Sequence, residues 1–497
     1  MTQLSSATLG ALGPDVAVPR YRRDRLTPGI LHVGVGNFHR AHQALYLDDL
    51  FNAGRDHDWA VVGAGVRPGD AAMRAALAGQ DWLTTVVELE PGANTARITA
   101  PMVDFVPVEA GNAPLVAAMS DPRIRIVSLT VTEGGYFIDP GTGVFDPAHP
   151  EIRADATSPA RPGTVFGAIV EALRRRRAAG TPPFTVMSCD NIPANGEVAR
   201  DAVAGLARLT DPALADWIRA NVAFPNGMVD RITPATTDSQ RAQLAARFGV
   251  EDAWPVFCEP FRQWVMEDRF PQGRPAFEEV GVTFTDDVAA FELMKLRILN
   301  GGHAIIAYPA ALLDLHDVHS AMAHPLVAGL FDKIEREEIL PVVPPVPGTD
   351  LEDYLATIQA RFANPDVGDT VARLCFDGSN RQPKFILPST RDRLARGLPV
   401  TGLALESALW CRYLAGESES GAPIALDDVH AERLQAAARA ARRDPAAFLG
   451  LGDIFGDLAD DTTFRTAFAT ALTALWRDGV APTLERYLAL PPGAPLR

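Results

Sequence analysis

Short apolar runs that alternate with helical patterns dominate the first 190 residues of this chain. Four runs have the length and composition of buried strands: 29–36, 59–66, 123–132 and 184–190. Between them, two segments have the composition and length of helices: 38–51 and 164–180. Strands that alternate with helices predict an α/β fold, in which helices cover both faces of a parallel sheet. Residues 82–106 look more like antiparallel strands, so we expect the sheet to be mixed.

Long helical patterns replace this alternation from about residue 286 onwards. They cover 286–314, 325–339, 350–363, 402–415, 428–442 and 461–478, and a proline-rich loop at 340–350 interrupts them. A chain of 497 residues is too long for a single hydrophobic core. We therefore predict two domains, with a boundary near residue 285 and a mostly α-helical C-terminal domain.

A glycine-rich turn stands between the first predicted strand and the first predicted helix. In HVGVGNFHR, Gly34 and Gly36 occupy positions where a tight turn lets backbone N–H groups face a pyrophosphate. The fingerprint G-x-G-x-x-G is incomplete, because His39 stands in place of the third glycine. An ordinary strand-to-helix turn is the alternative, but the context favours a Rossmann-like dinucleotide site. Its predicted residues are Gly34, Val35, Gly36, Asn37, Phe38 and His39.

The segment after the second predicted strand bears on which dinucleotide would bind. It reads RPGD, residues 67–70. Asp70 could accept a hydrogen bond from a ribose hydroxyl, which favours NAD, whereas Arg67 could meet a 2′-phosphate, which favours NADP. These residues alone leave both cofactors open.

Lysine is rare in this chain. Of 46 Lys and Arg residues, 43 are arginine, because 46 − 3 = 43 and the only lysines are Lys295, Lys333 and Lys384. Arginine stays protonated, whereas a lysine amine can lose its proton when it is desolvated or lies near another cation. A position that must release and regain a proton can therefore use lysine but not arginine, although chance retention would leave the same count.

The helical segment around Lys295 carries four polar side chains on one face. At 100° per residue from Lys295, Glu292 falls at roughly 60°, His303 at roughly 80° and Asn300 at roughly 140°. Buried polar groups need partners, so this face is either a polar contact between helices or a ligand site. The pair Gly301-Gly302 costs about 1 kcal/mol per glycine relative to alanine in a helix, which indicates a kink or a close approach to the backbone.

Several classes of protein are disfavoured by composition. A net charge of −16 argues against a nucleic-acid partner, and no apolar stretch has the length of a membrane span. The histidines of HDVHSAMAH lack an accompanying acidic pattern, and the cysteines form no C-x-x-C pair (Cys189, Cys258, Cys375 and Cys411). With no secretory signal pattern at the N-terminus, we expect a metal-free cytoplasmic protein without nucleic-acid or membrane partners.

Five motifs occur in order along almost the whole chain. They are GVGNFHRAHQA, SCDNIPANG (188–196), FPNGMVDRITP (224–234), KLRILNGGH (295–303) and LCFDGSNRQPKF (374–385). Together they resemble the polyol-specific long-chain dehydrogenases, the mannitol dehydrogenase family. The resemblance implies a Rossmann-like domain at 1–285 and a helical domain at 286–497, with the active site at their interface. It also implies a monomer that oxidises a polyol such as mannitol to a ketose, and catalyses the reverse, with NAD rather than NADP and without a metal.

The resemblance further implies roles for residues at matching positions. Lys295 is expected to be the general base, Asn191 and Asn300 to donate to the alkoxide, and His303 to position the substrate. A neutral amine can be the base if burial and a positive nicotinamide ring lower its pKa. Contacts to the outer hydroxyls are expected from Asp230, Arg373 and Arg381, and Glu292 would either relay the proton to solvent or form an ion pair.

Two alternatives remain open at this point. A fructuronate reductase would use the same chemistry on a uronate, but such relatives carry a different sequence after DGS. A non-catalytic NAD-binding sensor would keep the fold, yet it would have no need of a base such as Lys295.

Overall fold

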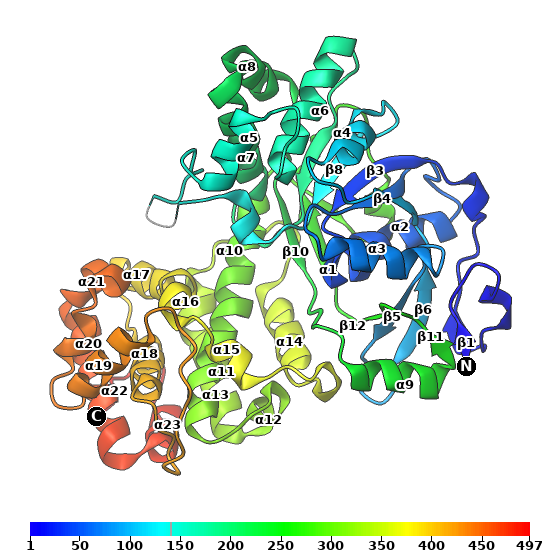
Figure 1. Ribbon diagram of the computed structural model, residues 1–497. Coiled ribbons are helices and arrows are strands. Elements are labelled where there is room, and N and C mark those ends of the chain that lie inside the picture. Colours follow the sequence, from blue (N-terminus) through cyan, green and yellow to red (C-terminus); the bar gives the residue numbers. More distant parts are fainter. Residues whose placement is uncertain (140–141) are drawn as a thin grey trace. The chain divides into compact units, whose positions relative to one another are not determined.

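The computed structural model describes residues 1–139 and 142–497, which form two compact units, Met1–Ala289 and Ala290–Arg497 (Figure 1). A five-stranded sheet is the centre of the first unit, and all its strand pairs are parallel. Its strand order is β7 (Met102–Phe105), β4 (Ala60–Ala64), β3 (Pro28–Val33), β8 (Ile126–Leu129) and β9 (Thr185–Ser188). Val33 lies opposite Ala64 on one side and Leu129 on the other, so these strands reach their carboxyl ends together.

Helices cover both faces of this sheet, as the alternation of strands and helices predicts. Successive side chains of a strand point to opposite faces. Leu31 and Val33 therefore share one core with α4 (Ala113–Ser120), α6 (Val165–Ala179) and α7 (Asn195–Thr210). Ile30 packs on the other face, together with Leu47 and Leu50 of α2 (Gln43–Asn52). The Rossmann-like fold class is confirmed.

The antiparallel strands expected within 82–106 are present, but they belong to a separate sheet. That sheet has the order β12 (Val256–Cys258), β5 (Thr84–Glu88), β6 (Thr95–Thr99) and β2 (Val16–Ala17), with β5 and β6 antiparallel. Pro101 separates β6 from β7, and proline has no N–H with which to continue a ladder. The chain changes sheets at this point, so the prediction of one mixed sheet is corrected to a parallel sheet and a smaller mixed one.

The first predicted helix is broken into two. It comprises α1 (Asn37–Ala41) and α2, separated by His42 with φ −124° and ψ −89°. The His42 ring is buried against Phe38 and Trp264, and its Nε2 lies 2.9 Å from the Gln263 carbonyl oxygen. These tertiary contacts hold His42 outside helical geometry. By contrast, α6 matches its prediction, since Thr164 caps its N-terminus and Gly180, with φ +68°, closes it.

The second unit is helical. Its longest helices are α11 (Gly301–Leu312), α13 (Pro325–Ile334), α14 (Leu351–Phe362), α18 (Thr401–Leu414), α19 (Ala431–Ala441) and α22 (Thr462–Asp478). Every residue of α18 is buried, as expected of a helix that is packed on all sides. Short helices that the sequence did not predict fill the remaining space, among them α15 (Val371–Cys375) and α16 (Gly378–Phe385). Pro383 inside α16 hides the helical pattern from a reading of the sequence.

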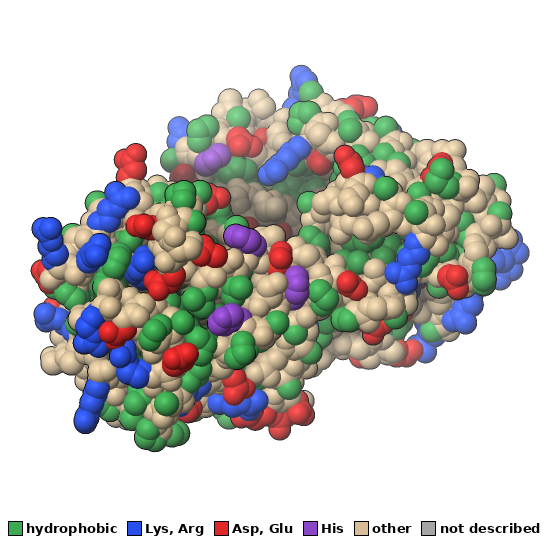
Figure 2. Space-filling view, turned by 90° about the horizontal axis from the view of Figure 1, so that it is seen from below, with side chains coloured by type: hydrophobic (Ala, Val, Ile, Leu, Met, Phe, Trp, Pro, Cys, Tyr) green, Lys and Arg blue, Asp and Glu red, His purple; other side chains and the backbone are tan. Residues whose placement is uncertain are grey.

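Charged side chains of both signs are interspersed over the face shown in Figure 2. Among the described residues, no helix combines the length and the apolar character that crossing a membrane requires.

Candidate active site

The glycine turn at the end of β3 depends on Gly34. This residue has φ +96°, and its N–H donates to the Ala64 carbonyl oxygen of the neighbouring strand at 2.9 Å. A Cβ atom at Gly34 would lie 2.1 Å from the carbonyl oxygen of Thr130, which is closer than any Cβ can approach. At Gly36 the nearest atom to such a Cβ would be 3.8 Å away. Gly34 therefore shapes the turn, whereas Gly36 leaves free space beside it, as the approach of a pyrophosphate requires.

His39, at the position of the missing third glycine, is stacked on His32 of β3. The ring centroids are 3.5 Å apart with an interplanar angle of 16°. His32 Nδ1 lies 2.8 Å from Ser128 Oγ and Nε2 lies 2.9 Å from Thr130 Oγ1. Burial lowers the pKa of His32 to about 3 and takes the pKa of His39 well below its ordinary value, so both rings are neutral. Helix and strand thus approach closely through stacked imidazoles, where the usual fingerprint uses a glycine.

The remaining predicted cofactor residues lie around the same turn. The side chains of Val35 and His39 are buried, so these two could meet a dinucleotide only through their backbone. Asp70 follows β4, and its Oδ2 accepts a hydrogen bond from the Arg67 N–H at 2.8 Å. The Arg67 side chain is exposed. Whether Asp70 binds a ribose remains a prediction.

The loop that carries Asn191 is anchored by its neighbour Asp190. The Asp190 carboxylate accepts hydrogen bonds from the N–H groups of Val131 (3.0 Å) and Thr132 (2.9 Å) and from the hydroxyl of Tyr136 (2.7 Å). Burial raises the pKa of Asp190, and these hydrogen bonds oppose that rise. Asn191 itself is exposed directly after β9, at the carboxyl edge of the parallel sheet.

Asn195 connects this loop to the strand that carries Asp230. Its Nδ2 donates to the carbonyl oxygens of Asp190 (3.1 Å) and Gly227 (2.7 Å), while its Oδ1 accepts from the Gly227 N–H (2.9 Å). Gly227 begins β10 (Gly227–Asp230), and Asp230 is buried at its end. The sequence reading passed over Asn195, although it belongs to the motif SCDNIPANG. The hydrogen bonds of Asn195 thus connect the loop that carries Asn191 to the strand that carries Asp230.

The segment around Lys295 is not one regular helix. It consists of α10 (Val288–Met294), a π-helix at Lys295–Asn300, and α11. Our projection at 100° per residue is therefore wrong across these six residues. In a π-helix the hydrogen bonds join residues i and i+5, so Asn300 lies closer to Lys295 around the helix axis than it would in an α-helix. Lys295 is buried, and single π-turns inside α-helices are frequent at functional sites.

The glycine pair after the π-helix lies where other helices pack against the backbone. Gly302 has helical geometry, but a Cβ there would lie 2.6 Å from the ring of Phe331. A Cβ at Gly301 would lie 3.4 Å from the carbonyl oxygen of Phe385, at the end of α16. Gly302 thus marks a close approach of Phe331 to the helix backbone, whereas a Cβ atom at Gly301 would make only an ordinary contact.

His303 is surrounded by cationic side chains. Its ring stacks on Phe362 with centroids 4.2 Å apart, and its buried Nε2 has no hydrogen-bond partner within the described part of the chain. Burial lowers the pKa of His303 well below its ordinary value, and the charges of Arg373, Arg361 and Arg381 lower it further. His303 is therefore neutral, and its Nε2 could form a hydrogen bond with a substrate. It also lies near Arg373 and Arg381, the two predicted substrate contacts, so these features fit a substrate-binding role.

The two predicted arginines are held by the protein itself. Arg373, on α15, forms an ion pair with Asp369. Arg381, on α16, donates from Nη1 to the carbonyl oxygens of Arg373 and Leu374, each at 3.1 Å. Arg381 is therefore fixed against the helix that carries Arg373. In the second unit, the structure thus groups the two arginines with His303, whereas Glu292 lies on α10, which leads into the π-helix.

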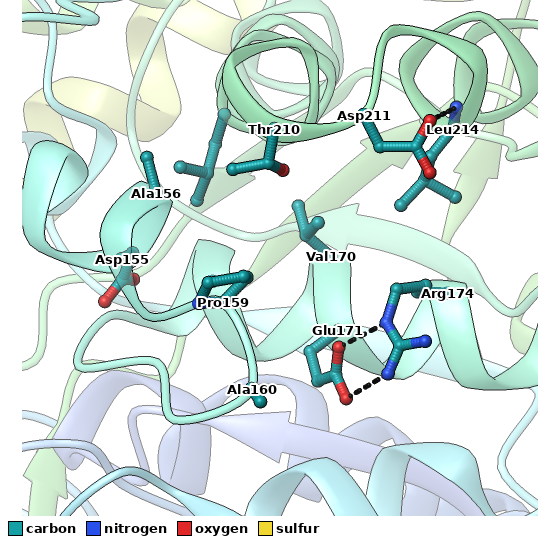
Figure 3. Close-up of a pocket in the computed structure, with 12 residues that line it drawn as sticks. Asp155, Ala156, Pro159, Ala160, Val170, Glu171, Arg174, Thr210, Asp211 and Leu214 are labelled. Carbon is teal, nitrogen blue, oxygen red and sulfur yellow. Dashed lines mark hydrogen bonds and ion pairs between the residues drawn. The ribbon is translucent and has the colours of Figure 1, made fainter.

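A separate pocket in the first unit contains none of the predicted residues. It has a volume of about 270 Å³ and lies between α5 (Pro150–Thr157), α6 and the junction of α7 with α8 (Pro212–Asn221) (Figure 3). Its polar side chains serve local structure: Glu171 pairs with Arg174, and Asp211 caps α8. Nowhere in residues 1–139 and 142–497 do three His, Cys, Asp or Glu side chains gather as a metal site would require.

The fold and these residues define a class of nicotinamide-dependent dehydrogenase in which a Rossmann-like unit precedes a helical unit. Residues 28–279 match the mannitol dehydrogenase Rossmann domain, and residues 287–476 match the mannitol dehydrogenase C-terminal domain. The chain belongs to the mannitol dehydrogenase family.

Relatives of this family resemble the chain over nearly its whole length. Mannitol 2-dehydrogenase of Cereibacter sphaeroides is 62% identical over 474 residues, which cover 95% of this chain and 99% of that protein. The ternary complex of Pseudomonas fluorescens mannitol 2-dehydrogenase with NAD and D-mannitol has a TM-score of 0.85 and 42% identity, and covers 99% of this chain and 100% of that one. A substrate-free D-sorbitol dehydrogenase has a TM-score of 0.89 and 34% identity, and covers 96% and 99%.

Proposed function

We propose that this protein oxidises D-mannitol to D-fructose with NAD and catalyses the reverse reduction. The observation that carries the proposal is the likeness, over 99% of the chain, to a mannitol 2-dehydrogenase whose complex contains NAD and D-mannitol. The room beside Gly36 fits a dinucleotide, because its backbone is open to a close approach. NAD, when bound, accepts the hydride that leaves the carbinol carbon.

Lys295 is the base in this proposal. Its neutral amine takes the proton of the substrate hydroxyl. The electron pair of the broken O–H bond then forms the second carbon–oxygen bond of the ketone as a hydride leaves the same carbon. Lys295 is buried, and burial disfavours the charged form of an amine. Glu292, on the preceding α10, would pass the proton on to solvent.

Asn191 and Asn300 stabilise the oxygen as it becomes an alkoxide. Amide N–H groups donate hydrogen bonds without adding a positive charge that would hold back the hydride. The π-helix supports this role, because it brings Asn300 closer to Lys295 around the helix axis than an α-helix would. Asn191 belongs to the first unit, and Asn300 belongs to the second.

The outer hydroxyls of the polyol would be bound by polar residues with complementary hydrogen-bonding groups. His303 offers an unpaired ring nitrogen, and Arg373 and Arg381 offer guanidinium donors. Asp230 supplies a carboxylate acceptor at the end of β10. A neutral polyol needs donors and acceptors of this mixed kind, whereas a uronate would gain most from a bidentate arginine pair.

One copy of the chain carries every residue that this proposal uses, so we propose that the enzyme works as a monomer. Its four cysteines are unpaired and buried, which suits a reducing compartment such as the cytoplasm. Light scattering on the purified protein would measure its mass directly.

The decisive experiment is a substrate panel on purified protein. D-mannitol, D-arabinitol, D-sorbitol and D-mannonate would be oxidised, and D-fructose and D-fructuronate reduced, each with both cofactors. We expect D-mannitol and D-fructose to give the highest kcat/KM. A preference for fructuronate over fructose by more than about tenfold, or 1.4 kcal/mol, would make the protein a uronate reductase. NAD binding without turnover would make it a sensor.

A further inference from the structure

Two fully buried polar side chains meet in the interior of the second unit, on helices α16 and α18. Gln382 and Glu406 both have 0% of their surface exposed. Gln382 Nε2 donates to Glu406 Oε1 at 2.5 Å, and the Ser407 hydroxyl lies 3.5 Å from Glu406 Oε2. None of these side chains belongs to the set predicted to contact substrate or cofactor, so their burial needs another explanation.

The carboxyl group of Glu406 is mostly protonated at neutral pH. Burial raises its pKa to about 8, and the hydrogen bonds from Gln382 and Ser407 oppose that rise only in part. Among the described residues, no arginine or lysine contributes to this shift. An apolar pair of similar shape would avoid the cost of burying these polar groups, so stability alone gives little reason for them.

The pair lies where the helices that carry predicted substrate residues come together. The hydroxyl of Tyr308, on α11, interacts with Gln382, and a Cβ atom added at Gly378, at the start of α16, would lie 3.0 Å from that hydroxyl. On α15, the Cys375 thiol donates to the carbonyl oxygen of Ala307 on α11 at 3.6 Å. A hydrogen-bonded network therefore links α11, α15, α16 and α18.

These same helices hold the substrate-facing side chains. His303 is on α11 and Arg373 is on α15. Arg381 directly precedes Gln382 on α16, and its guanidinium reaches the last turn of α15. A shift of α16 along α18 would therefore move Arg381 away from both of its carbonyl partners and from His303.

We propose that the hydrogen bond between Gln382 and Glu406 positions Arg381 and so sets the affinity for the polyol. Gln382 and Glu406 are thus positioning residues that never touch the substrate. This inference rests on the proposed function, because it uses Arg381 as a substrate contact. A hydrogen bond has a defined direction and length, which apolar contacts lack, so it can fix one register of α16 on α18.

The test separates positioning from stability with single and double variants. Gln382→Leu and Glu406→Leu each leave one buried polar group unpaired, whereas the double variant removes both. We expect each single variant to lower the melting temperature and to raise KM for the polyol at least tenfold. In the double variant we expect the melting temperature to recover only in part, because the buried Tyr308 hydroxyl still lacks Gln382, while KM stays raised. In all three, kcat should stay within threefold and KM for NAD within twofold of wild type.

Two further variants serve as controls. Glu406→Gln keeps the shape of the side chain and an oxygen that can accept the hydrogen bond from Gln382. KM for the polyol in this variant should therefore stay within threefold of the wild-type value. Glu338 is likewise a buried glutamate, and it accepts hydrogen bonds from the N–H groups of Gly402 and Leu403 at the start of the same helix α18. Glu338→Gln should lower the melting temperature without raising KM for the polyol.

The outcomes are distinct from those that judge the proposed function. The substrate is first identified with the wild type, and KM is replaced by a calorimetric Kd if the wild type binds without turnover. If mannitol is not a substrate, the proposed function is overturned. The ratio of KM in the variants to KM in the wild type can still be measured with whichever substrate the panel identifies. A double variant with wild-type KM would overturn the positioning role, as would single variants that lose stability without a change in KM.

Discussion

Exchanging the two glycines of the cofactor turn for alanine, one at a time, should separate shaping of the turn from contact with the cofactor. Gly34 has φ +96°, a conformation that costs a residue with a side chain on the order of 1–3 kcal/mol. Its Cβ would also lie 2.1 Å from the Thr130 carbonyl oxygen, and forcing such an overlap costs roughly 1–3 kcal/mol more. Gly34→Ala should therefore lower the free energy of unfolding by about 2–6 kcal/mol.

Gly36→Ala is the matched control. Gly36 has φ −88° and ψ −174°, which alanine adopts without strain, and the nearest atom to its Cβ would be 3.8 Å away. Alanine at such a site leaves stability unchanged or raises it by roughly 0.4–1 kcal/mol. The added methyl group, however, would occupy the space through which a pyrophosphate approaches. We expect the Kd for NADH to rise at least tenfold, about 1.4 kcal/mol.

Both quantities can be measured on the same preparations. Chemical unfolding followed by circular dichroism gives the free energy of unfolding, and quenching of protein fluorescence by NADH gives Kd. Wild-type stability in Gly34→Ala would refute the steric argument. Wild-type affinity in Gly36→Ala would show that the dinucleotide does not approach this turn.

Four other expectations concern the base, the charge state of Glu406, the choice of cofactor and metals. Lys295→Ala should lower kcat for polyol oxidation by about 10²–10⁴-fold, and small primary amines should partly restore it. Lys295→Arg should stay inactive in the same assay. Near-normal turnover in the arginine variant would exclude lysine as the base. The pKa of Glu406 rises from 4.5 to about 8 in the fold, so its contribution is complete below pH 4.5 and is lost as the pH rises to 8. Relative to wild type, Glu406→Gln should therefore gain up to roughly 5 kcal/mol in unfolding free energy between pH 4.5 and 8.5, and a pH-independent difference would show that Glu406 is already ionised. The wild type should prefer NAD, and Arg67→Ala should weaken NADP more than NAD if Arg67 meets a 2′-phosphate; a tenfold wild-type preference for NADP would reverse the assignment. Prolonged treatment with EDTA or phenanthroline should leave kcat unchanged, and a loss that zinc restores would reveal a metal site.

Much of the fold could be predicted from local pattern because its signals lie close together in the sequence. An apolar run, two glycines and a helix within some 25 residues place the turn at Gly34, and each signal depends on backbone preferences of the residues themselves. The same holds for α6, whose cap at Thr164 and closing Gly180 are visible in the sequence. For the candidate site, the residue types were informative because proton transfer admits lysine and excludes arginine at such a position.

Tertiary structure decided what depends on residues far apart in the chain. The apolar pattern of 286–314 suits one continuous α-helix, and the π-helix at Lys295–Asn300 that turns Asn300 toward Lys295 cannot be seen in it. In the sequence, His39 is a departure from the glycine fingerprint, and only the fold shows that its ring stacks on His32. Gln382 and Glu406 are 24 residues apart and show no common pattern, yet they share one hydrogen bond in the interior. Such pairings lie beyond a sequence reading because a buried polar group can be satisfied by any suitable partner, and only the packed chain brings one within 3 Å.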